Sequence, residues 1–244
     1  MKTILAIAGF DPSGGAGLLR DLKTFGDFGC RGVSVATALT AQNSSRVSST
    51  LVVPPEFLEK QAVELLEEFT VDAVKIGMTG SAANVKAIES LIRRKGLRNV
   101  VLDTVLVSTS GYPLLDKKGV PALKRLLPRV TLVTPNIPEA SALTGIDISG
   151  IRGMEEAARA LHSMGARSVL IKGGHLNGPP TDILYDGKGF QRFTGRRIRG
   201  GKERFHGTGC ILSSAIAAGL AKGHNLKKSV KEAKEYLNRT LTER

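Results

Sequence analysis

Short, continuously apolar runs alternate along this chain with longer stretches of helical periodicity, and no other feature constrains its fold as strongly. The first apolar run, residues 3–8, passes through a glycine-rich turn into a helical pattern that places Leu18, Leu22 and Phe25 on one face. Strands without polar residues are buried on both sides, which is typical of a parallel sheet covered by helices. The sequence therefore predicts a doubly wound α/β fold.

The same alternation continues to the C-terminus. Further strands are predicted at residues 33–39, 73–76, 100–102, 130–133 and 168–171. Helices are predicted at residues 56–69, 82–94, 120–127, 155–164, 210–221 and 226–241. Two last strands, 183–185 and 190–193, flank Asp186-Gly187, a dipeptide typical of tight hairpin turns. We expect a mainly parallel central sheet with a C-terminal antiparallel edge hairpin and, since the chain has no linker or internal repeat, one domain over residues 1–244.

The composition leaves several classes of partner open and argues against others. With 35 Lys and Arg against 22 Asp and Glu, the net charge is +13, which suits anionic ligands, nucleic acid or an acidic membrane surface alike. Cys30 and Cys210 lie far apart without metal-ligand spacing, which argues against a disulfide framework or a structural zinc site. This cysteine usage fits a reducing compartment, and no apolar stretch has the form of a signal peptide or a membrane span. We expect a cytoplasmic protein with no membrane partner.

A glycine-rich segment, residues 9–17, lies where the first strand passes into the first helix, at the carboxyl edge of the predicted sheet. Ligands of open α/β sheets bind along this edge. The segment is neither a P-loop nor a dinucleotide fingerprint, because it lacks the Lys-Ser or Lys-Thr of the first and the third glycine of the second. It is either a ligand-binding loop or a turn with a purely conformational role. Asp21, one turn into the helix, is either a solvated acid or a carboxylate that faces a substrate.

Two polar residues follow other strands of the sheet. Gln42 comes after the second strand, and its amide offers one acceptor and two donors to a heterocycle; the alternative is an ordinary polar loop residue. Lys172 ends the strand at 168–171, and its ammonium is well suited to a phosphate. His175 follows in the same loop, and we assign it no catalytic role.

The segment 134–139 follows the strand at 130–133, and its two prolines favour an extended exit before a helix that begins near Glu139. Asn136 and Glu139 could act as a turn residue and a first-turn helix acid. Glu139 together with Asp103 could also supply oxygen ligands to Mg²⁺, which in proteins needs only one or two carboxylates beside waters and substrate phosphates. Both interpretations can hold at once.

Residues 206–210, His-Gly-Thr-Gly-Cys, directly precede an apolar helix and are the most informative segment. Glycines at a helix start let backbone N–H groups converge on an anion such as a transferring phosphoryl group. Cys210 lies at this terminus, where we expect the thiol pKa to fall toward neutrality, so that it could accept a proton from a substrate hydroxyl. The alternative for Cys210 is a small buried residue, which is also our interpretation of Cys30.

Basic residues precede this segment and recur in the last helix. We expect one or two of the first group to screen nucleotide phosphates and the rest to be solvated: Arg196, Arg197, Arg199, Lys202 and Arg204. On the last helix we expect a solvated basic face: Lys227, Lys228, Lys231 and Lys234. With 8 Phe, 3 Tyr and no Trp, a stacking platform for single-stranded nucleic acid is poorly supported.

Together, seven segments in family order resemble hydroxymethylpyrimidine/phosphomethylpyrimidine kinase, the thiamine-biosynthetic branch of the ribokinase-like superfamily. They are residues 9–17, 39–43, 75–78, 102–105, 134–139, 172–175 and 206–210, and the resemblance runs from about residue 4 to residue 237. It implies a ribokinase-like kinase, dependent on ATP and Mg²⁺, that phosphorylates 4-amino-5-hydroxymethyl-2-methylpyrimidine and then its monophosphate.

The resemblance also implies roles for individual residues. Five would line the pyrimidine pocket, with Gln42 bonded to the ring: Gly9, Asp21, Gln42, Met78 and Val105. Three would serve the nucleotide and metal: Asn136, Glu139 and Lys172, the last also assisting transfer. Gly207, Thr208 and Gly209 would form an anion hole, and Cys210 would stand where sugar kinases of the superfamily carry an aspartate base.

Two departures and two alternatives accompany this resemblance. Phe10 replaces a residue that is usually smaller and polar, so we expect it to reshape the pocket rim. The sequence stops at Arg244, before a Gly-rich tail common in the family, and we expect this difference to alter oligomer contacts. The family is usually dimeric, so we expect a homodimer. The alternatives are a pyridoxal or pyridoxine kinase of the same superfamily and, from a different class, a basic nucleic-acid-binding protein.

Overall fold

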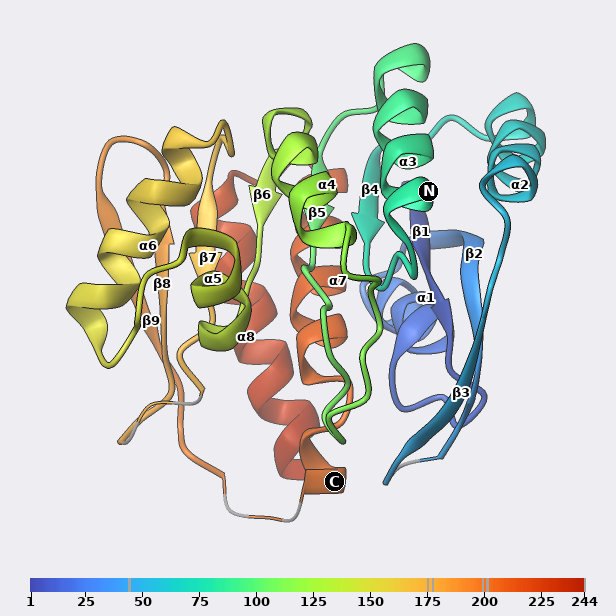
Figure 1. Ribbon diagram of the computed structural model, residues 1–244. Coiled ribbons are helices and arrows are strands. Elements are labelled where there is room, and N and C mark those ends of the chain that lie inside the picture. Colours follow the sequence, from blue (N-terminus) through green and yellow to red (C-terminus); the bar gives the residue numbers. More distant parts are fainter. Residues whose placement is uncertain (44, 175, 177, 199, 201, 244) are drawn as a thin grey trace.

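The computed structural model describes residues 1–43, 45–174, 176, 178–198, 200 and 202–243. Within these residues, nine strands form one sheet in the order β3-β2-β1-β4-β5-β6-β7-β8-β9 (Figure 1). The strands are β1 (Thr3–Phe10), β2 (Arg31–Gln42), β3 (Val47–Val52), β4 (Ala73–Ile76), β5 (Val100–Leu102), β6 (Leu132–Val133), β7 (Val169–Ile171), β8 (Thr181–Tyr185) and β9 (Phe190–Thr194). The pairings from β2 through β7 are parallel, so the predicted central sheet is confirmed.

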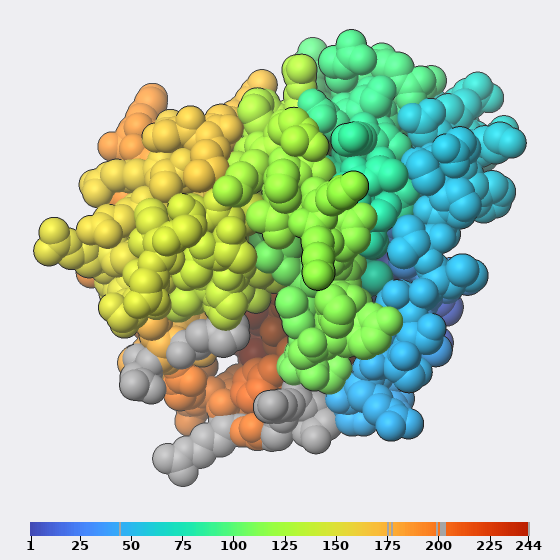
Figure 2. Space-filling model, in the orientation of Figure 1, coloured from blue at the N-terminus to red at the C-terminus, as the bar shows by residue number. Residues whose placement is uncertain are grey.

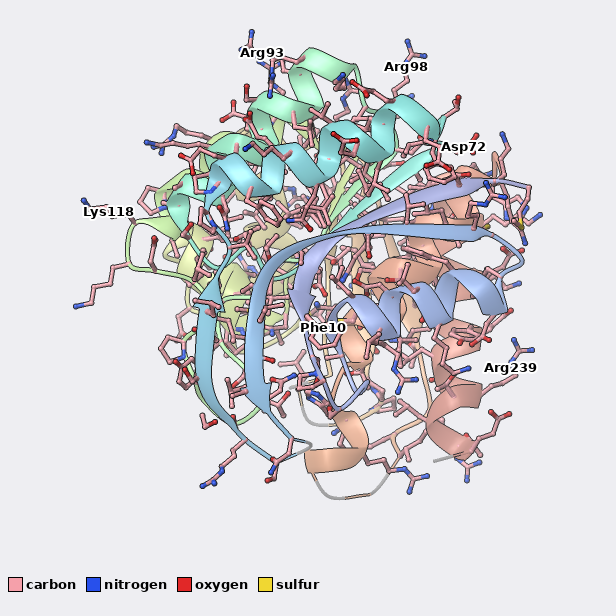
Figure 3. The ribbon with its side chains drawn as sticks, turned by 90° about the vertical axis from the view of Figure 1, so that its right-hand side faces the viewer. Phe10, Asp72, Arg93, Arg98, Lys118 and Arg239 are labelled. Carbon is pink, nitrogen blue, oxygen red and sulfur yellow. The ribbon has the colours of Figure 1, made fainter. Side chains whose placement is uncertain are left out.

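Helices cover both faces of this sheet (Figures 1 and 3). One face carries α2 (Pro55–Glu68), α3 (Ala82–Lys95), α4 (Gly119–Leu126), α5 (Ile137–Thr144) and α6 (Ile151–Ser163). The other carries α1 (Gly17–Asp27), α7 (Thr208–Ala221) and α8 (Leu226–Glu243). Two 3₁₀ turns, η1 (Leu127–Arg129) and η2 (Lys202–Phe205), complete the assigned elements.

Strand β1 shows why most positions of the central strands are apolar. Leu5 and Ile7 pack into the core beneath α2–α6, whereas Ile4, Ala6 and Ala8 pack into the core beneath α1, α7 and α8. Successive side chains of a strand point to opposite faces, so a strand with helices on both sides buries both sets of side chains and is apolar at nearly every position. This burial is the physical basis of the doubly wound fold.

The two edges of the sheet are antiparallel. At one edge β8 and β9 form the predicted hairpin, with Ile183 opposite Arg192. At the other edge β3 pairs antiparallel with β2, and this strand is missing from the sequence prediction. Its residues are mostly exposed or half-buried serine, threonine and valine, so it lacks the apolar run that marks the central strands. Figure 3 shows β2 and β3 as a curved pair that extends beyond the helices.

Most predicted element bounds agree with the structure within a few residues. The helix predicted near Glu139 begins at Ile137, and α6 begins four residues before the predicted start at 155. Within the described part of the chain, no helix combines the length and apolarity needed to cross a membrane. Because β1, β4, β5, β6 and β7 are parallel, their carboxyl ends meet at one edge, where the loops converge.

Candidate active site

A cavity of about 900 Å³ lies at this carboxyl edge. In Figure 2 the surface is hollowed below the green and yellow segments, and orange residues of the C-terminal part form its floor. The structure brings together here, as cavity-lining residues, all but one of the residues singled out from the sequence: Gly9, Gln42, Met78, Asp103, Val105, Asn136, Glu139, Lys172, Gly207, Thr208, Gly209 and Cys210.

Asp21 is the exception, because it lies behind the cavity rather than in its wall. The side chain is fully buried on α1 and accepts hydrogen bonds from Lys75 Nζ at 2.7 and 2.8 Å and from Ser214 Oγ at 2.8 Å. Neither alternative for Asp21, a solvated acid or a carboxylate that faces a substrate, agrees with this structure. A carboxylate buried so deeply needs a cation, and Lys75 supplies it.

Lys75, which the sequence analysis left without a role, does line the cavity. Burial lowers the pKa of its ammonium, but the adjacent Asp21 carboxylate more than offsets this, so the pKa lies above its usual value. The sequence signal was present: Lys75 is the single charged residue in the four-residue buried strand β4. A lysine in such a strand requires an internal partner, because an unpaired buried charge is very costly.

The segment at 207–210 forms the start of α7. Gly207 adopts a left-handed conformation, with φ of 76°, and Ile211 N–H donates the first helical bond to its carbonyl at 2.9 Å. The preceding N–H groups of a helix have no acceptor within the helix, so they are available to an anion. A Cβ at Gly209 would lie 3.2 Å from Lys172 Nζ and 3.3 Å from Asp103 Oδ2. The glycine thus lets the helix start approach both charged groups.

Cys210 lies at this helix start, but its thiol is not activated as the sequence suggested. Burial raises its pKa to about 11, and the lowering effect of Lys75 is opposed by the carboxylates of Asp21 and Asp103. The predicted fall toward neutrality is therefore wrong. A helix terminus favours the thiolate only modestly, whereas burial and two nearby negative charges oppose it.

Lys172 and Asp103 form a close ion pair on the cavity wall. Lys172 Nζ lies 2.6 Å from Asp103 Oδ1, and Asp103 also accepts hydrogen bonds from Thr134 at 3.2 Å and Ser213 at 3.3 Å. Burial raises the pKa of Asp103, but Lys172 and Lys75 outweigh it, so the carboxyl is held below its usual pKa. The pair presents an ammonium to the cavity beside an ionised carboxylate.

Asn136 and Glu139 act as a turn residue and a first-turn helix acid, which is one of the two interpretations that the sequence left open. They form a capping box at the start of α5, in which Asn136 N donates to Glu139 Oε2 at 2.8 Å and Glu139 N donates to Asn136 Oδ1 at 2.9 Å. Both also line the cavity. Burial raises the pKa of Glu139 to about 7 against the opposing effect of Lys172. A nearby cation would stabilise the ionised form of this carboxyl group and lower its pKa.

The opposite wall of the cavity is more apolar. Met78 is buried and packs in a small cluster with Ala38 and Leu114, against which Val105 also packs. A Cβ at Gly9 would lie only 2.7 Å from Met78 Sδ, so glycine is what lets β1 approach this side chain. Gln42, at the end of β2, adds an amide to this wall, and Phe10, labelled in Figure 3, also lines the cavity.

Three further polar residues line the cavity: Asp11, His206 and Lys234. Asp11 and His206 are joined by a contact of 2.9 Å between Asp11 Oδ2 and His206 Nε2. Lys234 was predicted to be solvated, but it is buried and forms an ion pair with Asp182, so that prediction is wrong, whereas Lys227, Lys228 and Lys231 are exposed as expected. Spacing along α8 cannot identify Lys234, because its partner lies on β8.

Two of the basic residues before the anion-binding segment also reach the cavity. Arg196 and Arg197 are exposed and line it, whereas Arg204 donates to the carbonyl of Leu241 at 2.8 Å and is therefore engaged with α8. His175, Arg199 and the side chain of Lys202 lie outside the residues that the structure describes.

The sequence matches the family model described as phosphomethylpyrimidine kinase over residues 11–244. Among curated proteins, it is 42% identical over 239 residues to a hydroxymethylpyrimidine/phosphomethylpyrimidine kinase of Aquifex aeolicus, with 97% of this chain and 93% of that protein aligned. It is 47% identical over 241 residues to the thiamine biosynthesis bifunctional protein ThiED of Geobacter sulfurreducens. That match covers 98% of this chain but about half, 49%, of the bifunctional protein.

Solved structures of two kinds of kinase share the fold. The phosphomethylpyrimidine kinase of Clostridium difficile 630 is 36% identical, with a TM-score of 0.87 and with 99% of this chain and 100% of that chain covered. The pyridoxal kinase of Staphylococcus aureus in complex with AMP-PCP and pyridoxal is 32% identical, with a TM-score of 0.89 and with 97% and 86% covered. Both neighbours are ribokinase-like kinases.

Proposed function

The chain belongs to the phosphomethylpyrimidine kinase family, and we propose that it transfers the γ-phosphoryl group of ATP to 4-amino-5-hydroxymethyl-2-methylpyrimidine and then to the resulting monophosphate, for thiamine biosynthesis. The observation that carries this proposal is one cavity in which Gln42 and Met78 lie on one wall and the start of α7 with Lys172 on the other. A heterocycle and a phosphoryl group can then be bound side by side.

We call the wall with Gly9, Asp11, Gln42, Met78 and Val105 the acceptor side. In the proposal its apolar surface receives the pyrimidine ring, and the Gln42 amide selects the ring by hydrogen bonds. Orientation of the hydroxymethyl arm toward the start of α7 would supply much of the rate, since holding two reactants in line replaces a bimolecular encounter.

We call the wall with Asp103, Glu139, Lys172 and residues 207–210 the phosphate side. Phosphoryl transfer depends mainly on positioning and on neutralising the charge of the transferring group. In the proposal the N–H groups of Gly207, Thr208 and Gly209 bind the γ-phosphoryl oxygens, and Lys172 neutralises them, with Asn136 on the nucleotide side. The S. aureus neighbour in complex with AMP-PCP supports ATP as the donor.

Mg²⁺ is part of the proposal, and the donor set fits it. Glu139 and Asp103 offer two carboxylates in one cavity, and Mg²⁺ is commonly held by one or two carboxylates together with waters and phosphates. Burial and the nearby Asp103 carboxylate raise the pKa of Glu139 despite Lys172, and a bound divalent cation would favour its ionised form. When bound, the ion would neutralise phosphate charge. Among the described residues there is no cluster of three His, Cys, Asp or Glu that would hold a metal alone.

Cys210 is our candidate for the proton acceptor in the first transfer. The substrate oxygen forms a bond to the γ-phosphorus, the bond from that phosphorus to ADP breaks, and the hydroxyl proton passes to Cys210. Because burial keeps the thiol protonated at neutral pH, this role requires that ligand binding bring it toward the thiolate. The second transfer needs no such acceptor, since a phosphate monoester is already largely ionised at pH 7.

An ATP-consumption assay with the hydroxymethylpyrimidine, followed by mass spectrometry of the products, tests the proposal. We expect the monophosphate to appear first and the pyrophosphate later. Absence of both products would refute the proposed function, and formation of the monophosphate alone would reduce it to a single-step kinase.

A pyridoxal or pyridoxine kinase is the second candidate, because the S. aureus pyridoxal kinase has a TM-score of 0.89 to this chain. Pyridoxal also carries a hydroxymethyl arm, but its ring offers different groups to Gln42. Parallel steady-state assays decide between the two. A larger kcat/KM for pyridoxal than for the hydroxymethylpyrimidine would overturn our substrate assignment.

We further propose that residues 1–244 act as one domain, that the protein works as a homodimer in the cytoplasm, and that it binds no nucleic acid. The continuous sheet supports a single domain. The exposed side chains of Leu39, Leu51 and Phe57 near the β2–β3 edge support a homodimer. The free thiols of Cys30 and Cys210 fit a reducing compartment. Light scattering tests whether the protein is a dimer. Salt-sensitive binding of nonspecific duplex DNA would contradict the proposal that the protein binds no nucleic acid.

A further inference from the structure

Asp11 organises the loop that connects β1 to α1. Its carboxylate has only 2% of its surface exposed and accepts hydrogen bonds from Ser13 N at 2.8 Å, Ser13 Oγ at 2.7 Å and Ala16 N at 2.8 Å. The loop then closes on itself, because a Cβ at Gly17 would lie 2.3 Å from the carbonyl oxygen of Gly9. A single buried carboxylate therefore determines the shape of residues 11–17 on the acceptor side.

The same carboxylate also contacts the loop that leads into α7. His206 Nε2 lies 2.9 Å from Asp11 Oδ2, although 195 residues separate them in the chain. The two loops also pack tightly where both carry glycine: a Cβ at Gly15 would lie 2.2 Å from His206 Cδ2, and one at Gly207 would lie 1.9 Å from the Gly15 carbonyl oxygen. The two loops are thus interlocked.

The direction of this hydrogen bond follows from the state of the carboxylate. Burial raises the pKa of Asp11, but hydrogen bonds from His206, Ser13 and Gln42 outweigh burial and hold it well below its usual value. An ionised carboxylate only accepts hydrogen bonds, so Nε2 of His206 must carry the hydrogen and donate it. The contact needs a donor on His206 rather than the imidazole ring as such.

We propose that Asp11 and His206 form a positioning pair that holds the acceptor loop, residues 11–17, in register with the anion-binding segment, residues 207–210. Both loops line the same cavity, so their relative position sets the distance between the acceptor oxygen and the phosphoryl group. The expected effect of this pair on turnover rests on the proposed function. Neither residue needs to touch the reacting atoms.

Three variants test the pair by turnover. For His206→Ala we expect kcat to fall by about 10–100-fold, because displacing reacting groups by about 1 Å can lower the rate by up to about 100-fold. We expect the KM for ATP to change by less than about 3-fold. His206→Gln keeps an N–H donor near the position of Nε2, so we expect kcat within about 5-fold of the parent. His224→Ala is the matched control, because His224 makes a similar 2.9 Å contact with Glu232 outside the cavity.

A double-mutant cycle separates a pair from two independent residues. Asp11→Asn keeps the size of the side chain but loses its charge, and if the two residues act together, adding His206→Ala should lower kcat by less than about 3-fold further. Additive losses of kcat in the double mutant would overturn the proposal. Equal losses for His206→Gln and His206→Ala would also overturn it, because they would assign the effect to packing of the imidazole ring against Gly15. Asp11→Asn and His206→Gln also serve if His206→Ala fails to fold.

Hydrogen exchange of the ligand-free protein gives a readout that does not depend on turnover. We expect His206→Ala to increase exchange both at residues 11–17 and at 207–210, with β4 and β5 unchanged. An increase confined to 207–210 would overturn the proposal. A parent protein that fails to phosphorylate the pyrimidine would refute the proposed function, while the exchange comparison would still test the pair.

Discussion

Asp11 on the acceptor side and Glu139 on the phosphate side are both nearly inaccessible, with 2% and 7% of their surfaces exposed, yet their pKa values move in opposite directions. Asp11 receives hydrogen bonds from Ser13, Ala16 and His206, and its pKa falls well below the usual value. Burial raises the pKa of Glu139 to about 7, with Asp103 adding to the rise. Burial alone does not decide the charge of a carboxyl group; the donors and charges around it do.

The contrast suggests how the two sides divide the work. The carboxylate of the acceptor side is satisfied by the protein itself, so that side can be shaped before any ligand arrives. On the phosphate side, burial and the Asp103 carboxylate outweigh Lys172 at Glu139, so this carboxyl group keeps a raised pKa, which suits a site whose ligands bring their own charge. Four further experiments test this division, ordered from the largest expected effect to the smallest.

Removing the cation of the phosphate side should have the largest effect. We expect Lys172→Met to lower kcat/KM by about 10²–10³-fold, the usual cost of removing one group that stabilises developing negative charge. Lys228→Met, which changes an exposed lysine of α8, should leave kcat/KM within 2-fold or so. A loss below about 10-fold for Lys172→Met would mean that this side does not depend on its ammonium.

Cys210→Ala should separate the two phosphorylations. We expect it to lower kcat for the hydroxymethyl substrate by about 10²-fold, while the Kd of the pyrimidine stays nearly unchanged. Turnover of the monophosphate should fall much less, because its oxygen needs no proton acceptor. Cys30→Ala, remote from the cavity, is the control. Turnover of both substrates within a few-fold of the parent would show that Cys210 is structural.

Gln42→Ala should weaken only the acceptor side. We expect the Kd of the pyrimidine to rise by about 10-fold, as for the loss of one or two hydrogen bonds, with the Kd of ATP unchanged. Isothermal titration calorimetry with each ligand alone measures both. An unchanged pyrimidine Kd would remove Gln42 from the binding site.

Glu139 should make the folding stability of the ligand-free protein pH-dependent. In the folded protein its pKa is about 7 instead of the ordinary 4.5, so the folded state keeps a proton that the unfolded state releases. The free energy of unfolding should therefore decrease as the pH rises from 4.5 to about 7, by on the order of 1–3 kcal/mol. Urea denaturation at both ends of this range measures it.

Glu139→Gln should lose this decrease, because glutamine does not titrate. Glu235→Gln, which changes an exposed residue of α8, should keep it. If the parent and Glu139→Gln showed the same dependence, another group would be responsible, and the contrast between Glu139 and Asp11 would not describe the protein in solution.

Much of the site was predictable because it is encoded locally. Glycine-rich and polar segments follow the strands, and parallel strands bring their carboxyl ends to one edge, so Gly9, Gln42, Lys172 and residues 207–210 could be assigned to one site before the fold was known. Strand β3 was missed because an edge strand open to solvent does not need an apolar run. Lys234 was misjudged because its partner, Asp182, is distant in sequence.

The sequence by itself determined the α/β layers, the order of the central elements and the segment types at the carboxyl edge, since burial on two faces and helical periodicity are properties of short stretches. The tertiary structure decided what each charged group does there. It placed Asp21 behind Lys75 instead of in the cavity, raised the pKa of Cys210 to about 11, and joined Asp11 to His206 across 195 residues. Electrostatic effects depend on burial and on neighbours in space, and no local pattern of residues contains either.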